Sequence, residues 1–195
     1  MKEYYDRRAP SYDDWYLGRG RYAGRDAESW ERDLAGLVAV VEALMPTRTL
    51  DVACGTGFLT RHLHGDVVGL DQSPSMLEIA ARKAPHATFV QGDGLSLPFP
   101  NGSFGRVFTG HFYGHLDPEE RARFLAEARR ISGELVVVDA AQRPDHQLEE
   151  VQQRELPDGT AWPVLKRYFT PDLLRDELGG GEVLHDGPWF VAVRA

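Results

Sequence analysis

One stretch of this sequence, residues 50–57, constrains the fold more than any other. It reads Leu-Asp-Val-Ala-Cys-Gly-Thr-Gly, so that an apolar run ends at Asp51 and a turn built on Gly55 and Gly57 follows. The next residues have a helical pattern, and together they predict a strand, a glycine turn and a helix over 57–64. A helix that begins there exposes backbone N–H groups with partial positive charge, which suit a carboxylate or a phosphate. Because glycine has no Cβ, a ligand can approach the backbone closely.

Two further acids stand where later strands are expected to end. Val67–Asp71 and Phe89–Asp93 both read as strands that end in an acid, and Asp71 follows Asp51 by 71 − 51 = 20 residues. An acid at that separation can accept hydrogen bonds from both hydroxyls of a ribose, and the third acid could accept one from the exocyclic amine of adenine. A glycine turn alone would be a weak signal, whereas the turn and both acids in order predict a ligand that contains adenosine.

These segments together resemble the class I methyltransferases that use S-adenosylmethionine, in their small-molecule, type 11/25-like branch. The segment Phe104–His111 is similar to the strand that borders the methyl-transfer site of that family. The N-terminal run Tyr5–Asp13 is similar to the family's entry segment. The resemblance covers most of residues 4–141. It implies a methyltransferase that binds S-adenosylmethionine and releases S-adenosylhomocysteine. The four segments that resemble the family's motifs are Asp51–Gly57, Gly69–Pro74, Gln91–Gly94 and Phe104–His111.

The resemblance also implies which residues hold the cofactor. Asp51 suits the ammonium group of the methionine part, Asp71 the ribose and Asp93 the adenine. The cofactor-binding residues expected on this basis are Tyr12, Asp51, Ala53, Gly55, Gly57, Asp71, Gln72, Met76, Gly92, Asp93, Gly94 and Thr109.

Two alternative functions stay open. A nicotinamide-dependent oxidoreductase is disfavoured, because its fingerprint needs a third glycine or alanine where this chain has Thr60, and because Asp51 would repel a pyrophosphate. A P-loop is excluded, since no Gly-Lys-Ser/Thr follows the turn. A non-catalytic module that only binds S-adenosylmethionine is the other alternative.

Alternating apolar runs and amphipathic segments predict an α/β fold with a doubly wound, mostly parallel sheet. The resemblance implies a seven-stranded, Rossmann-like sheet that ends in an antiparallel C-terminal hairpin. We expect one domain over residues 1–195, with 1–25 as an N-terminal lid and 142–170 as a small insertion on the substrate side. Helices are expected at 26–45, at 57–64, from Pro74 with Ser73 as cap, over 117–131, at 145–155, and from Pro171 with Thr170 as cap. Strands are expected at 48–53, 66–71, 87–91, 104–109, 135–138, 161–169, 182–186 and 189–194.

The acceptor pocket is expected to form from the N-terminal tyrosines, the loop after 104–109 and the insertion. His111 is the candidate general base or hydrogen-bond donor. In the strand 161–169, Lys166 and Arg167 lie on opposite faces, so one can enter a pocket while the other is solvated. The expected substrate residues are Tyr5, His111, Tyr113, His115, Arg154 and Lys166.

The stretch Arg154–Pro171 resembles small bacterial O-methyltransferases of natural-product pathways, including one that acts on a phosphonate acid. The expected reaction is therefore methyl transfer to an oxygen of a small molecule: a hydroxyl, a carboxylate or a phosphonate. No metal is expected, because the scattered His and Asp residues form no convincing ligand set.

Composition narrows the partners. The 195 residues carry a net charge of −8, which argues against a broad surface for nucleic acid or for anionic membranes. Cys54 is the sole cysteine, so no internal disulfide can form. The sequence shows no transmembrane run or signal peptide, and we expect a cytoplasmic protein.

Overall fold

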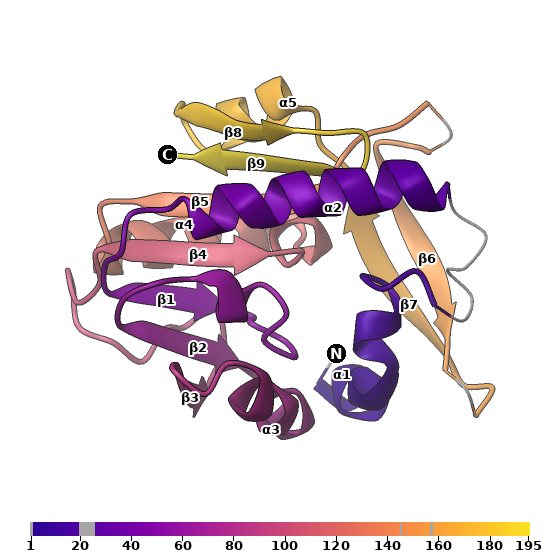
Figure 1. The fold of residues 1–195 in the computed structure, drawn as a ribbon, viewed down its shortest axis with the longest axis horizontal. Coiled ribbons are helices and arrows are strands. Elements are labelled where there is room, and N and C mark those ends of the chain that lie inside the picture. The colour runs from indigo at the N-terminus through magenta and orange to yellow at the C-terminus, as the bar shows by residue number, and fades with distance from the viewer. Residues whose placement is uncertain (1, 20–25, 145, 157) are drawn as a thin grey trace.

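A seven-stranded sheet forms the centre of the molecule (Figure 1). The structure, a computed structural model, describes residues 2–19, 26–144, 146–156 and 158–195. The sheet has the order β3-β2-β1-β4-β5-β9-β8; the first five strands in this order are parallel, and β9 runs antiparallel to both β5 and β8. This confirms the predicted doubly wound sheet with its C-terminal hairpin. The strands are β1 Thr49–Val52, β2 Val67–Asp71, β3 Thr88–Gln91, β4 Arg106–Gly110, β5 Leu135–Ala140, β8 Glu182–Asp186 and β9 Phe190–Arg194.

Helices begin where capping residues were expected. The Ser73 hydroxyl accepts from the Met76 N–H at the start of α3, Asp117 and Glu120 form a reciprocal capping box at the start of α4, and Thr170 caps α5. The helices are α1 Lys2–Arg8, α2 Ala27–Glu42, α3 Pro74–Lys83, α4 Pro118–Ile131 and α5 Pro171–Glu177, with short 3-10 helices η1 Ala9–Asp14, η3 Thr60–His62 and η4 Tyr113–His115.

The helix predicted at 57–64 is absent: the described chain there forms only the 3-10 turn η3. The Thr60 hydroxyl donates to Asp51 at 2.6 Å, and Leu63 leaves the helical conformation at ψ 142° so that its side chain is buried. The partial positive charge of a helix N-terminus is therefore not available to a ligand at this turn. The backbone of the glycine turn is the part that can still approach a ligand closely.

The helix predicted at 145–155 is also wrong, because Glu149–Glu155 is a strand, β6. Its Glu, Gln and Arg residues favour a helix locally. Every residue of β6 instead pairs with β7, Ala161–Arg167, in a separate two-stranded antiparallel sheet, and Glu149 lies opposite Arg167. Between β6 and β7, residue 157 lies outside the described residues, and Gly159 has a positive φ of 82°, which suits a tight turn.

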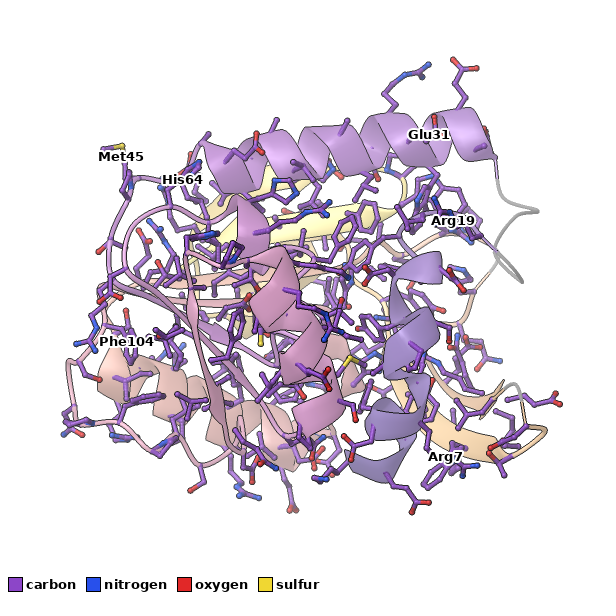
Figure 2. All side chains as sticks on the ribbon, turned by 60° about the horizontal axis from the view of Figure 1, so that its bottom comes forward. Arg7, Arg19, Glu31, Met45, His64 and Phe104 are labelled. Atoms are coloured by element: carbon purple, nitrogen blue, oxygen red, sulfur yellow. The ribbon has the colours of Figure 1, made fainter. Side chains whose placement is uncertain are left out.

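Two apolar clusters cover the two faces of the sheet. One contains Trp30, Leu37 and Val41 of α2, and the other contains Phe124 of α4 and Leu174 of α5. Figure 2 shows α2 as a surface helix, with Glu31 and Met45 exposed toward opposite ends of it. The carboxyl ends of β1, β2 and β4 point toward α1 and the β6–β7 hairpin (Figure 1). Among the described helices, none combines the length and apolar character needed to cross a membrane.

Candidate active site

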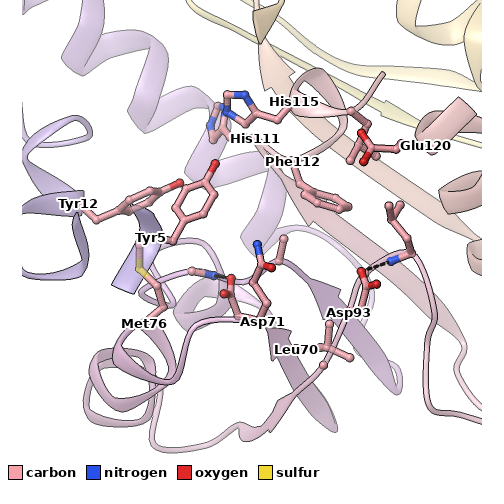
Figure 3. A pocket seen from close by; sticks show the side chains of 17 residues that line it. Tyr5, Tyr12, Leu70, Asp71, Met76, Asp93, His111, Phe112, His115 and Glu120 are labelled. Carbon is pink, nitrogen blue, oxygen red and sulfur yellow. Dashed lines mark hydrogen bonds between the residues drawn. The ribbon is translucent and has the colours of Figure 1, made fainter. Parts of the chain in front are cut away.

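A cavity of about 300 Å³ lies at the carboxyl ends of the parallel strands, where such sheets bind ligands. The glycine turn, the ends of β2 and β3, α3 and the N-terminal segment all contribute to it. Figure 3 shows Tyr5 and Tyr12 on one side of Asp71, and Phe112 and Asp93 on the other. The predicted residues that line this cavity are Tyr5, Tyr12, Ala53, Gly55, Asp71, Gln72, Met76, Gly92, Asp93, Gly94, His111 and His115. Leu70, Leu95, Phe112, Leu116 and Glu120 line it without having been predicted.

Asp71 connects the segments that line this cavity. Its carboxylate accepts hydrogen bonds from the Gly55 N–H and the Ser73 N–H, both at 2.9 Å. These bonds join the end of β2 to the glycine turn and to the start of α3. Burial raises the pKa of Asp71 above its usual value, and the two backbone bonds oppose that rise. The carboxylate is therefore oriented before any ligand arrives.

Backbone strain is concentrated at the same cavity. Ala53 and His111 are the non-glycine residues with positive φ in the described chain, at 56° and 58°, and both line it. Gly55 also has positive φ, and a Cβ added there would come no closer than 3.7 Å to any neighbour. Gly55 lines the cavity through its backbone alone, so no side chain stands between the turn and a ligand.

Asp51 does not reach this cavity. It lies in a recess of about 10 Å³ that Tyr16 and Phe58 help to line, with their rings stacked 3.8 Å apart. Burial raises the pKa of Asp51 to about 7 against the hydrogen bond from Thr60, and the charge of Asp71 adds to the rise.

Gly57 and Thr109 also lie outside the cavity. A Cβ at Gly57 would approach Ala80 of α3 to 3.1 Å, so this glycine permits close packing of the turn on α3. The Thr109 hydroxyl donates to the Val52 carbonyl at 2.8 Å, between β4 and β1. In the structure both residues stabilise the packing around the glycine turn and do not line the cavity.

A second cavity, of about 750 Å³, adjoins the first. Tyr12, His111 and His115 line both cavities, so the two meet at these three side chains. Arg154 and Lys166, predicted as substrate residues, line the second cavity. Tyr113, predicted with them, lines neither: it is buried against Phe124 and Phe169 in the core.

His111 is a neutral imidazole at this junction. Neither ring nitrogen has a hydrogen-bond partner among the described residues, and Nδ1 lies 4.0 Å from Asp139 Oδ1. Burial lowers the pKa of His111 to about 3; the carboxylate of Asp139 opposes this shift, and the charge of Lys166 adds to it. His111 is therefore a weak base that can still form hydrogen bonds.

His115 is held by the insertion. Its Nδ1 lies 2.6 Å from the Leu165 carbonyl, which accepts the hydrogen bond from the ring. Burial lowers the pKa of His115 well below its usual value, with the charges of Lys166 and Arg154 acting in the same direction.

A buried ion pair lies under the second cavity. Lys166 Nζ is 2.7 Å from Asp139 Oδ1, and the other oxygen of Asp139 accepts from the Gly114 N–H at 2.7 Å. Burial acts to raise the pKa of Asp139, but the positive charge of Lys166 and its hydrogen bond leave that pKa lowered. Asp139 was not predicted, although the apolar run 135–138 ends at this acid just as the earlier strands end at theirs.

Arg167 has its side chain on the opposite face of β7 from Lys166, where it pairs with Glu177, as the strand alternation predicts.

Other unpredicted residues come from distant segments. The unpredicted side chains in the second cavity include Arg8, Trp15, Asp26, Trp30, Arg143, His146, Gln152, Tyr168 and Trp189. Local sequence patterns could not bring them together, because they belong to the N-terminal segment, α2, the insertion and the C-terminal hairpin.

Comparison with known proteins identifies the family. Residues 49–133 match the family model described as a methyltransferase domain. The demethylmenaquinone methyltransferase of Thermotoga maritima is 34% identical over 143 residues, which cover 69% of this chain and 59% of that protein. The match thus spans less than two thirds of that relative's length. The 2-phytyl-1,4-naphtoquinone methyltransferase of Trichormus variabilis is 29% identical over 210 residues, 94% of this chain and 86% of that protein.

A solved structure supports the same assignment. The structure described as a DhpI–SAH complex superposes with a TM-score of 0.72 at 26% identity, covering 98% of this chain and 92% of that one. The sheet order, the matched domain and these relatives agree with the motifs at the strand ends. The chain belongs to the class I S-adenosylmethionine-dependent methyltransferases.

Proposed function

We propose that this protein transfers the methyl group of S-adenosylmethionine to an oxygen atom of a small-molecule acceptor. The observation that carries the proposal is the junction of the two cavities at Tyr12, His111 and His115. A cofactor in the smaller cavity and an acceptor in the larger one would meet there, in a buried place that limits access of water. S-adenosylmethionine would supply a methyl group on a positively charged sulfur.

The smaller cavity has the groups that such a cofactor needs. Asp71 offers a preoriented carboxylate for ribose hydroxyls, and Asp93, which accepts from the Leu95 N–H at 2.9 Å, offers one for the adenine amine. Gly55 has no side chain and lines this cavity with its backbone. These features support the assignment of the smaller cavity to the cofactor.

Of the two roles predicted for His111, general base or hydrogen-bond donor, we propose the second. With a pKa near 3 it takes up a proton poorly at neutral pH. Its two unpaired nitrogens can instead hydrogen-bond the acceptor or the cofactor at the junction. This favours an acceptor oxygen that is already ionised.

Calorimetry tests the proposal directly. S-adenosylhomocysteine should bind and NAD⁺ should not. Asp71→Ala should weaken S-adenosylhomocysteine binding at least tenfold, since each lost hydrogen bond to a charged acceptor is worth about 1.5–3 kcal/mol. Asp66→Ala, an exposed acid next to β2, is the control and should bind normally. Normal binding by a folded Asp71→Ala protein would contradict the ribose assignment.

Turnover separates an enzyme from a binding module. Incubation of the protein with methyl-labelled S-adenosylmethionine and bacterial metabolite pools should yield a labelled small molecule together with S-adenosylhomocysteine. Tight cofactor binding without any labelled product would favour the non-catalytic module.

A further inference from the structure

The larger cavity carries a positive charge next to the junction, and Arg154 is its clearest source. The guanidinium donates from Nε and Nη2 to Gln152 Oε1 at 3.2 and 3.0 Å, and within the described residues no carboxylate lies at ion-pair distance from it. Burial raises the pKa of Tyr12 to about 12, and the charges of Arg8 and Arg154 oppose the rise, so both cations act on a junction residue.

The other charged side chains of this cavity are of both signs. Among the described residues, four basic side chains line it, while one carboxylate, Asp26, lines it and a second, Asp139, lies beneath Lys166. Asp139 already neutralises Lys166, so Arg154 is left for a ligand. A cation in a concave site attracts anions, and a guanidinium such as that of Arg154 binds a carboxylate through two parallel hydrogen bonds.

Aromatic side chains form the other part of the cavity. Trp30 contacts Trp15 and Trp189 edge to face, with ring centroids 5.1 and 5.2 Å apart. From the insertion, His146 stacks on Tyr168 at 4.1 Å with an interplanar angle of 19°. Flat rings pack well on such walls. The volume of about 750 Å³ lies within the range of small-molecule sites.

We propose that the acceptor is an aromatic carboxylic acid and that the product is its methyl ester, which rests on the methyl transfer proposed above. Arg154 holds the carboxylate at the junction, and the aromatic walls hold the ring. One carboxylate oxygen forms the new bond to the methyl carbon, the carbon–sulfur bond breaks, and its electron pair stays on sulfur. The anion and the sulfonium are both neutralised, so no proton moves. A carboxylic acid is ionised at neutral pH, which agrees with a junction that contains only a weak base.

Binding of defined probes tests the acceptor class. In the presence of saturating S-adenosylhomocysteine, 1-naphthoate should bind at least tenfold more tightly than either cyclohexanecarboxylate or naphthalene-1-methanol, by calorimetry. Equal affinities for 1-naphthoate and either of the other probes would overturn the aromatic acid while leaving the methyl transfer intact. Failure of S-adenosylhomocysteine itself to bind would overturn the proposed function.

Variants at Arg154 test the anchor. Arg154→Met should weaken 1-naphthoate at least tenfold and change S-adenosylhomocysteine affinity less than twofold, and Arg154→Lys should recover part of the loss. Arg32→Met, an exposed arginine on α2, is the matched control and should change neither affinity. Thermal unfolding checks that each variant is folded. Unchanged 1-naphthoate binding in folded Arg154→Met would overturn the role of Arg154.

The product identifies the atom that is methylated. With methyl-labelled S-adenosylmethionine and 1-naphthoate, mild alkali should release the label as volatile methanol, because carboxylate esters hydrolyse under conditions that leave methyl ethers intact. When a hydroxylated aromatic acid is offered, the label should show the same lability. A base-stable product from that acid would overturn the ester and assign methylation to the hydroxyl.

Discussion

At the residue scale, two glycines of one motif have different roles. Gly55 and Gly57 both have positive φ, 54° and 74°. Gly55 borders the smaller cavity, whereas Gly57 packs against Ala80. The spacing in the sequence cannot separate these roles, because both glycines satisfy the same turn.

Alanine at each position should therefore give opposite results. Both changes cost about 1–2 kcal/mol because alanine resists positive φ, and Gly57→Ala should lose more stability because its Cβ crowds Ala80 at 3.1 Å. Gly55→Ala should lose more affinity for S-adenosylhomocysteine. Denaturant unfolding and calorimetry measure the two effects. If Gly57→Ala were the more stable and the weaker binder, the assigned roles would be wrong.

Asp51 predicts a pH dependence of stability. The folded carboxyl has a pKa of about 7, raised from its usual 3.8, so between these values the folded state binds more protons than the unfolded state. The contribution of protonated Asp51 to the free energy of unfolding is complete below pH 3.8 and is lost as the pH rises through 7. Denaturant unfolding should show that the free energy of unfolding of the natural protein falls, relative to that of Asp51→Asn, between pH 4.5 and pH 7.5. A constant difference across this range would contradict the buried, protonated carboxyl.

At the scale of elements, the β6–β7 hairpin is attached to the sheet by a buried charge. Lys166 of β7 pairs with Asp139 of β5, and both side chains are almost fully buried. Burial lowers the pKa of Lys166, while Asp139 opposes the change. The pair thus couples the position of the insertion to the junction of the two cavities.

Removal of one partner should be far more harmful than removal of both. Lys166→Met leaves Asp139 as an unpaired buried charge and should cost about 3–5 kcal/mol of unfolding free energy. The double variant Lys166→Met with Asp139→Asn should regain most of this loss. Urea unfolding measures both. A single variant within about 1 kcal/mol of the natural protein would show that the carboxylate finds other compensation.

At the scale of the whole molecule, the N-terminal segment joins the cofactor side to the insertion. Asp6 accepts from the Ser73 hydroxyl at 2.6 Å beside the smaller cavity, and Asp13 pairs with Lys83 of α3. On the other side Arg7 pairs with Asp158 at the end of the hairpin, and Figure 2 shows Arg7 next to that hairpin. We propose that this segment is the predicted lid; of the range 1–25, residues 1 and 20–25 lie outside the described part.

Amide hydrogen exchange tests the lid. Exposed ion pairs contribute little, so the segment can open when no ligand holds it. S-adenosylhomocysteine should slow exchange over residues 2–19, and helix α5, none of whose residues lines either cavity, should change little. Equal exchange in both states would make the segment a permanent structural part rather than a lid.

The sequence alone determined the features that depend on local chemistry. The acids at the ends of β2 and β3, the glycine turn and the caps at Ser73 and Asp117 were all predictable, because each depends on a few neighbouring residues. Strand periodicity and helix starts then specified the order of most elements, and the order specified the doubly wound sheet.

Only the tertiary structure decided the rest. The stretch 145–155 favours a helix by itself, but its part Glu149–Glu155 forms β6 because β7 pairs with it along its length. The helix at 57–64 is lost to the bond between Thr60 and Asp51 and to the burial of Leu63. The larger cavity requires side chains from both termini and the insertion, and no local pattern carries such long-range contacts. Local energies choose backbone conformations, whereas the burial of distant side chains against one another chooses which groups meet.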